Sequence, residues 1–168
     1  KLDNSSRESY DFFEHRDYLD GFLAGVGVRE NVMLVVHDWG SALGFHWAHR
    51  HPDAIRGIAY MEAITKPMLW DEFNQAARPV FEGFRSSAGE SMVLEKNIFV
   101  EKVLPGSIIR KLTEDEMAEY RRPFLDAGES RRPTLTWPRQ IPLDGEPVDV
   151  VKVVEAYGQW MATAEFPK

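Results

Sequence analysis

The stretch Val32-Met33-Leu34-Val35-Val36-His37-Asp38-Trp39-Gly40 decides the fold of this chain. Its first five residues are all apolar, which predicts a strand buried on both faces of a parallel sheet. Residues 41–50 follow without a break and predict a helix that ends near His51-Pro52. The sequence between them therefore predicts a sharp turn from strand to helix, with Asp38 at its apex.

A second strand is predicted at residues 55–61, which completes a strand-helix-strand unit of about 30 residues in the α/β class. Glu62 follows this strand as Asp38 follows the first one. The carboxyl ends of parallel strands share one edge of a sheet, where α/β enzymes place their reacting groups. We therefore expect the two carboxylates to lie at the same edge of the sheet, with Asp38 as the candidate nucleophile.

Each of these site residues also has a purely structural interpretation. An Asp at a strand-helix junction commonly caps the helix by accepting hydrogen bonds from its first free amides. Trp39 could serve only core packing, and Glu62 could be an ordinary solvated carboxylate. The succession Asp38-Trp39-Gly40, together with a second carboxylate at the next strand end, favours a catalytic role.

The composition predicts a folded protein that acts on a small neutral molecule. The chain has 168 residues, of which 43% are hydrophobic and 28% charged, enough for one domain and unlike a disordered chain. A formal charge of -7 argues against a nucleic-acid surface. The absence of cysteine and of a long apolar run leads us to expect a cytoplasmic protein without a membrane helix, with a periplasmic location left open.

Three regions are predicted along the chain. Residues 1–63 form part of an α/β core, residues 64–145 an inserted helical cap interrupted by prolines, and residues 146–168 a return helix and the start of another strand. Within the cap, Thr113 and Glu116 have the spacing of a capping box, which predicts a helix from 114 to about 122. The return helix, predicted from about 148 to 162, is expected to dock on the sheet.

The segment from Val35 to Trp47 resembles the nucleophile elbow of the haloalkane dehalogenases, in the α/β-hydrolase superfamily. Epoxide hydrolases share its His-Asp-Trp-Gly. Tyr60-Met61-Glu62-Ala63-Ile64 separates the two, because it resembles the acid-bearing segment of the second dehalogenase subfamily. The resemblance continues at 92–97, 99–106 and 131–142, and it implies a fragment of the α/β-hydrolase fold with an inserted helical cap. The elbow departs from Gly-x-nucleophile-x-Gly only in having Val36 at the first glycine.

The resemblance implies cofactor-free hydrolysis of haloalkanes to alcohol and halide. Asp38 would form an ester with the substrate carbon, Trp39 would bind the departing halide, and Glu62 would orient a histidine that activates water. The resemblance also implies an apolar substrate cavity lined by Phe73, Phe81, Phe99, Val103, Trp137, Pro138 and Ile141. The expected partners are a small halogenated hydrocarbon, water and halide, and a monomer is expected.

Two groups that this chemistry needs have no match in the sequence. The histidines are His15, His37, His46, His49 and His51. None lies where the family has its catalytic histidine, and the second halide-binding residue, an asparagine, has no match either. We therefore expect the chain to be the central portion of a longer enzyme.

The sequence is also compatible with two other functions and one other site. The functions are a coelenterazine luciferase of related architecture and a non-catalytic fragment that binds apolar ligands. The site is a metal cluster of His46, His49, His51 and Asp53. We predict no metal there, because these residues span a helix end on a face expected to be solvated.

Overall fold

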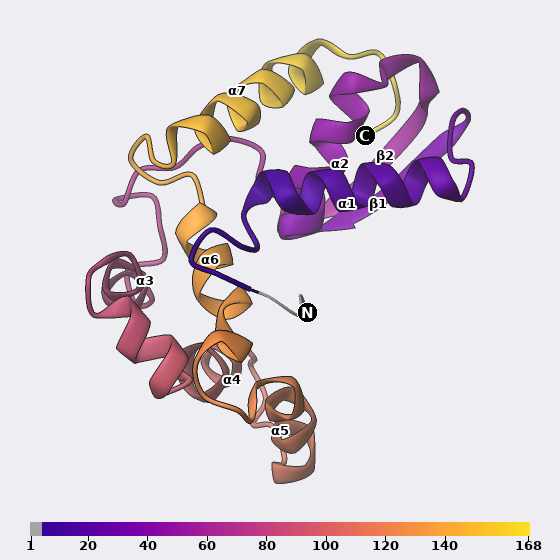
Figure 1. Cartoon of the computed structure of the whole chain (residues 1–168). Helices are drawn as coiled ribbons and strands as arrows, with labels where there is room; N and C mark the ends of the chain where they lie inside the picture. The colour runs from indigo at the N-terminus through magenta and orange to yellow at the C-terminus, as the bar shows by residue number, and fades with distance from the viewer. Residues whose placement is uncertain (1–4) are drawn as a thin grey trace. The chain divides into compact units, whose positions relative to one another are not determined.

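The computed structural model describes residues 5–168 and divides into two compact units (Figure 1). The α/β unit consists of Phe12–Trp70 and Ile141–Lys168. The helical unit consists of Asp71–Gln140 together with the described residues up to Asp11. The helical unit is thus shorter than the predicted cap of residues 64–145, and it includes an N-terminal segment that the sequence analysis assigned to the core.

The α/β unit contains the predicted strand-helix-strand unit. Strand β1 spans Val32–His37, helix α2 Trp39–Arg50 and strand β2 Ile55–Met61, and the two strands pair in parallel. Helix α1, Phe12–Gly25, precedes them and packs on α2. The predictions of both strands and of the helix between them are confirmed. The α2 helix begins two residues earlier than predicted, directly after Asp38.

Strand β1 is covered on only one face by the described residues. Met33 is 63% exposed and Val35 69% exposed, whereas Leu34 and Val36 are half-buried on the face that carries α2. Gly44 of α2 lies so close that a Cβ atom there would be 2.8 Å from Val36 Cγ1. The prediction of a strand buried on both faces is therefore wrong for this structure. An apolar run shows that both faces of a strand can be buried, but not that another element packs on each face.

Helix α7, Val148–Thr163, docks mainly on α2 rather than directly on the strands, which corrects the expected contact with the sheet. Tyr157 is fully buried, and its ring meets that of Phe45 at 5.5 Å. Phe45 also contacts Tyr60 of β2 at the same distance. The ring of Phe45, on α2, thus contacts both α7 and the sheet.

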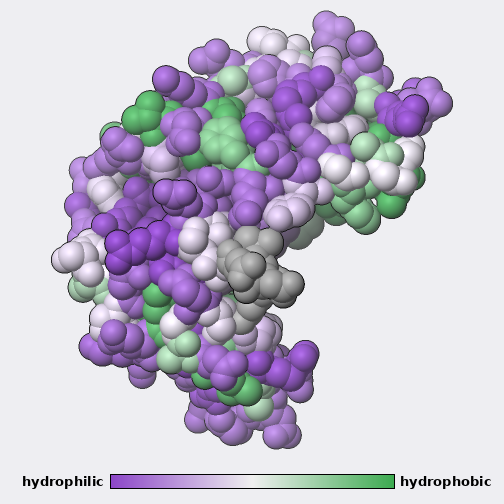
Figure 2. Space-filling view, in the orientation of Figure 1, coloured by the Kyte–Doolittle hydropathy of each residue, from purple (hydrophilic) through white to green (hydrophobic). Residues whose placement is uncertain are grey.

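At the surface of the α/β unit, the end of the chain lies beside β2, and apolar side chains of α1 are exposed. The Ile58 amide of β2 donates a hydrogen bond to the Pro167 carbonyl at 2.9 Å, so the end of the chain runs beside the free edge of β2. On α1, Tyr18 and Phe22 are more than half exposed, as is Val26 just beyond it. Figure 2 shows hydrophobic surface near the C-terminal end of α1.

The helical unit is built from short helices. They are α3 (Arg78–Arg85), α4 (Leu104–Gly106), α5 (Glu114–Arg121) and α6 (Pro133–Gln140), with π-helical turns at Ser91–Glu95 and Phe99–Val103 and 3₁₀ turns at Arg122–Phe124 and Glu129–Arg131. The predicted capping box of α5 is confirmed, since Thr113 and Glu116 each bond the backbone amide of the other. Within residues 5–168, every helix is too short or too polar to span a bilayer.

A small apolar core and two buried arginines hold the helical unit together. Phe84, Val93, Leu94 and Leu135 form the core. The guanidinium of Arg132, only 2% exposed, makes paired hydrogen bonds to Glu90 at 2.8 and 3.0 Å and also binds Glu129. Arg131 donates instead to four backbone carbonyls, of Leu94, Glu95, Phe124 and Leu125. These carbonyls belong to segments whose helices are too short to give each of them a hydrogen-bond donor within the same helix.

Candidate active site

Asp38 lies at the apex of the turn between β1 and α2, as predicted. Its backbone has φ 47° and ψ −129°. A positive φ is uncommon for a residue with a side chain and costs of order 1–3 kcal/mol, so it persists only where the surrounding structure holds it. This conformation lets the chain reverse from the strand into the helix within one residue.

The side chain of Asp38 does not cap α2. It occupies the N-cap position but accepts no hydrogen bond there, and the residue is exposed. The Asp38 carbonyl, by contrast, accepts hydrogen bonds from the Ser41 amide at 2.9 Å and the Ser41 hydroxyl at 2.5 Å. The capping alternative is therefore wrong, and the backbone of the turn is fixed while the carboxylate stays accessible.

Ser41 begins a chain of hydrogen bonds that joins three parts of the α/β unit. Its hydroxyl oxygen also accepts from the Ile64 amide at 2.9 Å, just beyond β2. The Ile64 carbonyl in turn accepts from the Tyr157 hydroxyl of α7 at 2.6 Å. Burial raises the pKa of Tyr157, so its hydroxyl stays protonated and remains a donor. The turn at Asp38 and the segment after β2 are thereby tied to each other and to α7.

Glu62 follows β2 and lies at the same edge of the sheet as Asp38. Its backbone is also in the left-handed region, with φ 46°. Its carboxylate is largely exposed, but Oε2 lies 2.8 Å from Nε2 of His37, the last residue of β1. This contact was not predicted from the sequence. The parallel register, which pairs His37 with Met61, is the signal that could have revealed it.

Trp39 is the first residue of α2 and is half-buried, with its ring 6.2 Å from that of Phe12. The glycine after it, Gly40, has no neighbouring atom within 4 Å of a Cβ position. The tight approach lies one turn later, at Gly44 against Val36. Because Val36 stands where the elbow pattern has its first glycine, the missing side chain of Gly44 provides the room that Val36 needs.

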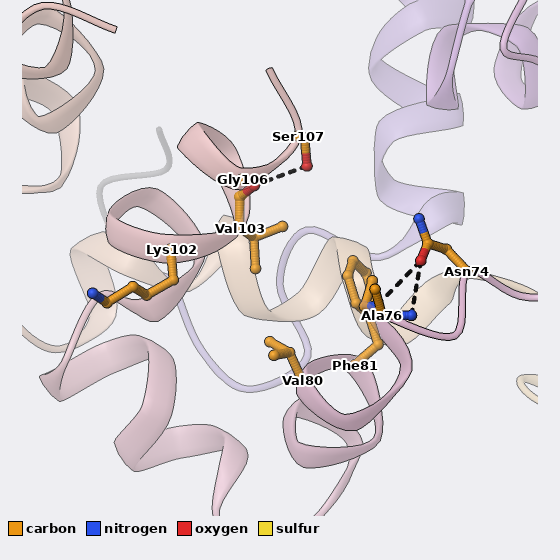
Figure 3. Close-up of a pocket in the computed structure, with 9 residues that line it drawn as sticks. Asn74, Ala76, Val80, Phe81, Lys102, Val103, Gly106 and Ser107 are labelled. Atoms are coloured by element: carbon orange, nitrogen blue, oxygen red, sulfur yellow. Dashed lines mark hydrogen bonds between the residues drawn. The ribbon is translucent and has the colours of Figure 1, made fainter. Parts of the chain in front are cut away.

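The helical unit contains a cavity of about 460 Å³ (Figure 3). Two of its lining residues, Phe81 and Val103, belong to the predicted substrate cavity. The others, which the sequence analysis missed, are Asn74, Ala76, Ala77, Val80, Lys102, Gly106 and Ser107. In Figure 3 the apolar side chains lie near the centre and Lys102 extends away from them. The cavity is thus lined by both apolar and polar groups.

The remaining predicted pocket residues are distributed over both units. In the helical unit, the rings of Phe73, Phe81, Phe84 and Phe99 form a continuous row, with successive centres 5.1, 5.6 and 6.3 Å apart. Phe84 of this row was not predicted and is fully buried. Trp137 is half-buried and Pro138 buried within α6, whereas Ile141 belongs to the α/β unit. The lining of the 460 Å³ cavity includes none of the other five predicted residues, which are Phe73, Phe99, Trp137, Pro138 and Ile141.

The histidines near the end of α2 make aromatic contacts. The ring of His46 packs against Phe12 at 5.7 Å, and burial lowers the pKa of His46 to about 4. The ring of His51 lies 4.7 Å from that of Trp47. The expectation of a solvated face is therefore wrong for His46. Across residues 5–168, no three His, Asp or Glu side chains are grouped as a metal site would require.

Comparisons with known proteins support the predicted fold class. Residues 3–90 match the family model of the alpha/beta hydrolase fold. Over its full length the chain is 55% identical to a haloalkane dehalogenase of Sphingobium indicum and 53% identical to one of Mycolicibacterium smegmatis, of which it covers 57% and 54%. The crystal structure of haloalkane dehalogenase DbeA from Bradyrhizobium elkani matches 99% of the chain with a TM-score of 0.89 at 46% identity, and 57% of that protein is covered. The chain thus spans little more than half the length of these relatives, and it belongs to the α/β hydrolase fold family.

Proposed function

We propose that this protein is a hydrolase that converts haloalkanes to alcohol and halide through an ester on Asp38. The observation that carries the proposal is the state of Asp38, an exposed carboxylate held at positive φ without a capping hydrogen bond. Backbone strain retained at one residue is typical of functional sites. The likeness to proteins named haloalkane dehalogenases supports the same reaction.

In the first step, a carboxylate oxygen of Asp38 attacks the carbon that bears the halogen. A carbon–oxygen bond forms as the carbon–halogen bond breaks, and the halide leaves with the bonding electron pair. The indole N–H of Trp39 is proposed to donate to the departing halide, because a neutral donor stabilises developing negative charge. Trp39 is adjacent to Asp38 and begins α2, so both groups are positioned by the same turn.

In the second step, water attacks the carbonyl carbon of the ester and gives its proton to a histidine. The bond between the acyl carbon and the alkoxy oxygen breaks, and the alcohol leaves with the proton that the histidine returns. Asp38 releases the second proton of the water to solvent and is again a carboxylate. The Trp39 amide is proposed to stabilise the oxyanion, and Glu62 to orient the histidine. We place this histidine, and the second halide-binding residue, outside the 168 residues.

The proposed substrates are small halogenated hydrocarbons. The apolar side chains of Val80, Phe81 and Val103 at the cavity of the helical unit support this, since an alkyl chain gains most from an apolar lining. The row of phenylalanine rings from Phe73 to Phe99 extends the apolar surface beside Phe81. Trp137 and Pro138 of the helical unit and Ile141 of the α/β unit stay predicted pocket residues.

Halide release from a series of short bromoalkanes tests the proposal, with Asp38→Asn as the matched control. The complete protein, which includes the activating histidine, is expected to release bromide, and its Asp38→Asn variant, which keeps the side-chain shape but is a far weaker nucleophile, is expected to release none above background. Absence of release from every bromoalkane would overturn the proposal. Binding of the bromoalkane without release would support the ligand-binding alternative, and light emission with coelenterazine would support the luciferase.

A further inference from the structure

The hydrogen bond between His37 and Glu62 joins two strand ends beside the candidate nucleophile. His37 ends β1 and Glu62 follows β2, and the register pairs His37 with Met61. The distance between His37 Nε2 and Glu62 Oε2 is 2.8 Å, within the range of a charge-assisted hydrogen bond. An ionised carboxylate only accepts hydrogen bonds, so Nε2 carries the proton and the imidazole is the donor.

The pair contributes little to the stability of the fold. The side chain of His37 is 57% exposed and that of Glu62 82% exposed. Pairs in such contact with water add little to stability, because water competes for both partners and two side chains lose freedom. Its effect therefore lies in orientation, since one of the two oxygens of an exposed carboxylate is held in place.

The backbone around the pair is fixed more firmly than its side chains. Asp38 and Glu62 both have positive φ, and Ser41 hydrogen-bonds the Asp38 carbonyl and the Ile64 amide. His37 and Glu62 thus extend from two strand ends whose spacing is set by the strand ladder and by Ser41. Because the backbone is fixed at both residues, the hydrogen bond between their side chains restricts mainly the rotation of the Glu62 side chain.

We propose that His37 is a positioning residue for Glu62, a role that rests on the function proposed above. By holding Oε2, His37 leaves Oε1 for the N–H of the histidine that activates water. Among residues 5–168, no side chain or amide donates to Oε1. His37 therefore assists hydrolysis of the Asp38 ester, whereas formation of the ester, which does not use Glu62, is independent of it.

Rapid-quench kinetics on the complete protein, which supplies the histidine that activates water, separates the two steps when a bromoalkane is added. His37→Phe is expected to form the ester at the wild-type rate and to hydrolyse it about fivefold more slowly, which is the upper end of what an exposed charged pair contributes. His37→Gln, whose amide N–H reaches toward Glu62, is expected to recover most of the rate, and His37→Asn, which is one methylene shorter, is not. His51→Gln, an exposed histidine at the end of α2, serves as the control.

The outcomes distinguish this role from the proposed function. If the wild-type protein forms no ester, the proposed function fails before His37 is tested. If the wild-type protein turns over and His37→Phe hydrolyses the ester at an unchanged rate, the positioning role is overturned. Equal slowing of both steps, or equal rates for the Gln and Asn variants, would also overturn it by showing a structural role. Should the Phe variant fail to fold, the comparison of Gln with Asn decides.

Discussion

The two units satisfy their buried polar groups in different ways. In the α/β unit, a parallel ladder and the chain Asp38, Ser41, Ile64 and Tyr157 pair backbone with backbone or with neutral hydroxyls. In the helical unit, whose described residues form no strand ladder, the guanidinium groups of Arg131 and Arg132 bind buried carbonyl and carboxylate groups. The unit with regular pairing fixes the turn at Asp38 through neutral hydrogen bonds, whereas the irregular unit depends on buried charge.

The largest expected effect is at Arg132. Arg132→Met keeps an apolar stem but leaves Glu129 without its cation and Glu90 with only its longer contacts to Arg139 and Arg7, at 3.5 and 3.9 Å. Because removal of one partner of a buried pair typically costs 3–5 kcal/mol, and both glutamates keep some contact with water, we expect a loss of about 3 kcal/mol in the free energy of unfolding. Urea unfolding measures this loss. Hydrogen exchange is expected to place it in the helical unit.

The matched control for Arg132 is Arg122→Met. Arg122 pairs with Glu119, and both side chains are 72% exposed. An exposed pair of this kind contributes less than about 1 kcal/mol. Similar losses for the two variants, or faster exchange confined to the α/β unit, would show that buried charge is not what holds the helical unit together.

A smaller effect is expected at the contact of α2 with β1. Gly44→Ala places a methyl group 2.8 Å from Val36 Cγ1, an overlap expected to cost about 1–3 kcal/mol. Val36→Ala removes that atom, so the double variant is expected to lose less than the sum of the single variants. Gly40→Ala, at a position with open space, is expected to be neutral or slightly stabilising. Strict additivity in thermal unfolding would contradict the proposed compensation between Val36 and Gly44.

The pH dependence of stability is expected to depend on His46. Burial lowers its pKa to about 4 in the folded state, against 6.5 for a free histidine. The unfolded chain therefore binds the proton more readily, and the stabilisation is complete above pH 6.5 and lost as the pH falls toward 4. The loss is expected to be of order 1 kcal/mol, because the ring is only half-buried.

Comparison with His46→Gln isolates this contribution, since the carboxylates that titrate in the same range are common to both proteins. The difference in unfolding free energy between wild type and variant is expected to shrink from pH 7 to pH 4. A difference that stays constant across this range would show that His46 is protonated equally in the folded and unfolded states.

The smallest expected effect concerns strain at the turn. Asp38→Gly relieves the positive φ, whereas Asp38→Ala retains it. The glycine variant is expected to be more stable than the alanine variant by about 0.5–1 kcal/mol, even though glycine adds entropy to the unfolded chain. Differential scanning calorimetry of the two variants measures this. An alanine variant of equal or greater stability would show that the turn is unstrained.

Local signals predicted the strands, the helix after Asp38 and the capping box of α5, because an apolar run or a cap is formed by neighbours in sequence. The features that were missed depend on distant partners. The open face of β1 depends on what covers it, and the contact of His37 with Glu62 depends on strand register. Arg132 resembles a surface residue in sequence, and only the placement of Glu90, 42 positions away, makes its burial favourable.

The most direct test of the account is the identification of the residue that carries the substrate alkyl group. After rapid acid quench of the purified protein with a bromoalkane, peptide mass spectrometry is expected to find one alkyl group on the peptide that contains Asp38, attached to the Asp38 side chain. The Asp38→Asn variant is expected to carry none. An alkyl group on Glu62 or another residue, or bromide release without any adduct on Asp38, would contradict the assignment of Asp38 as the nucleophile.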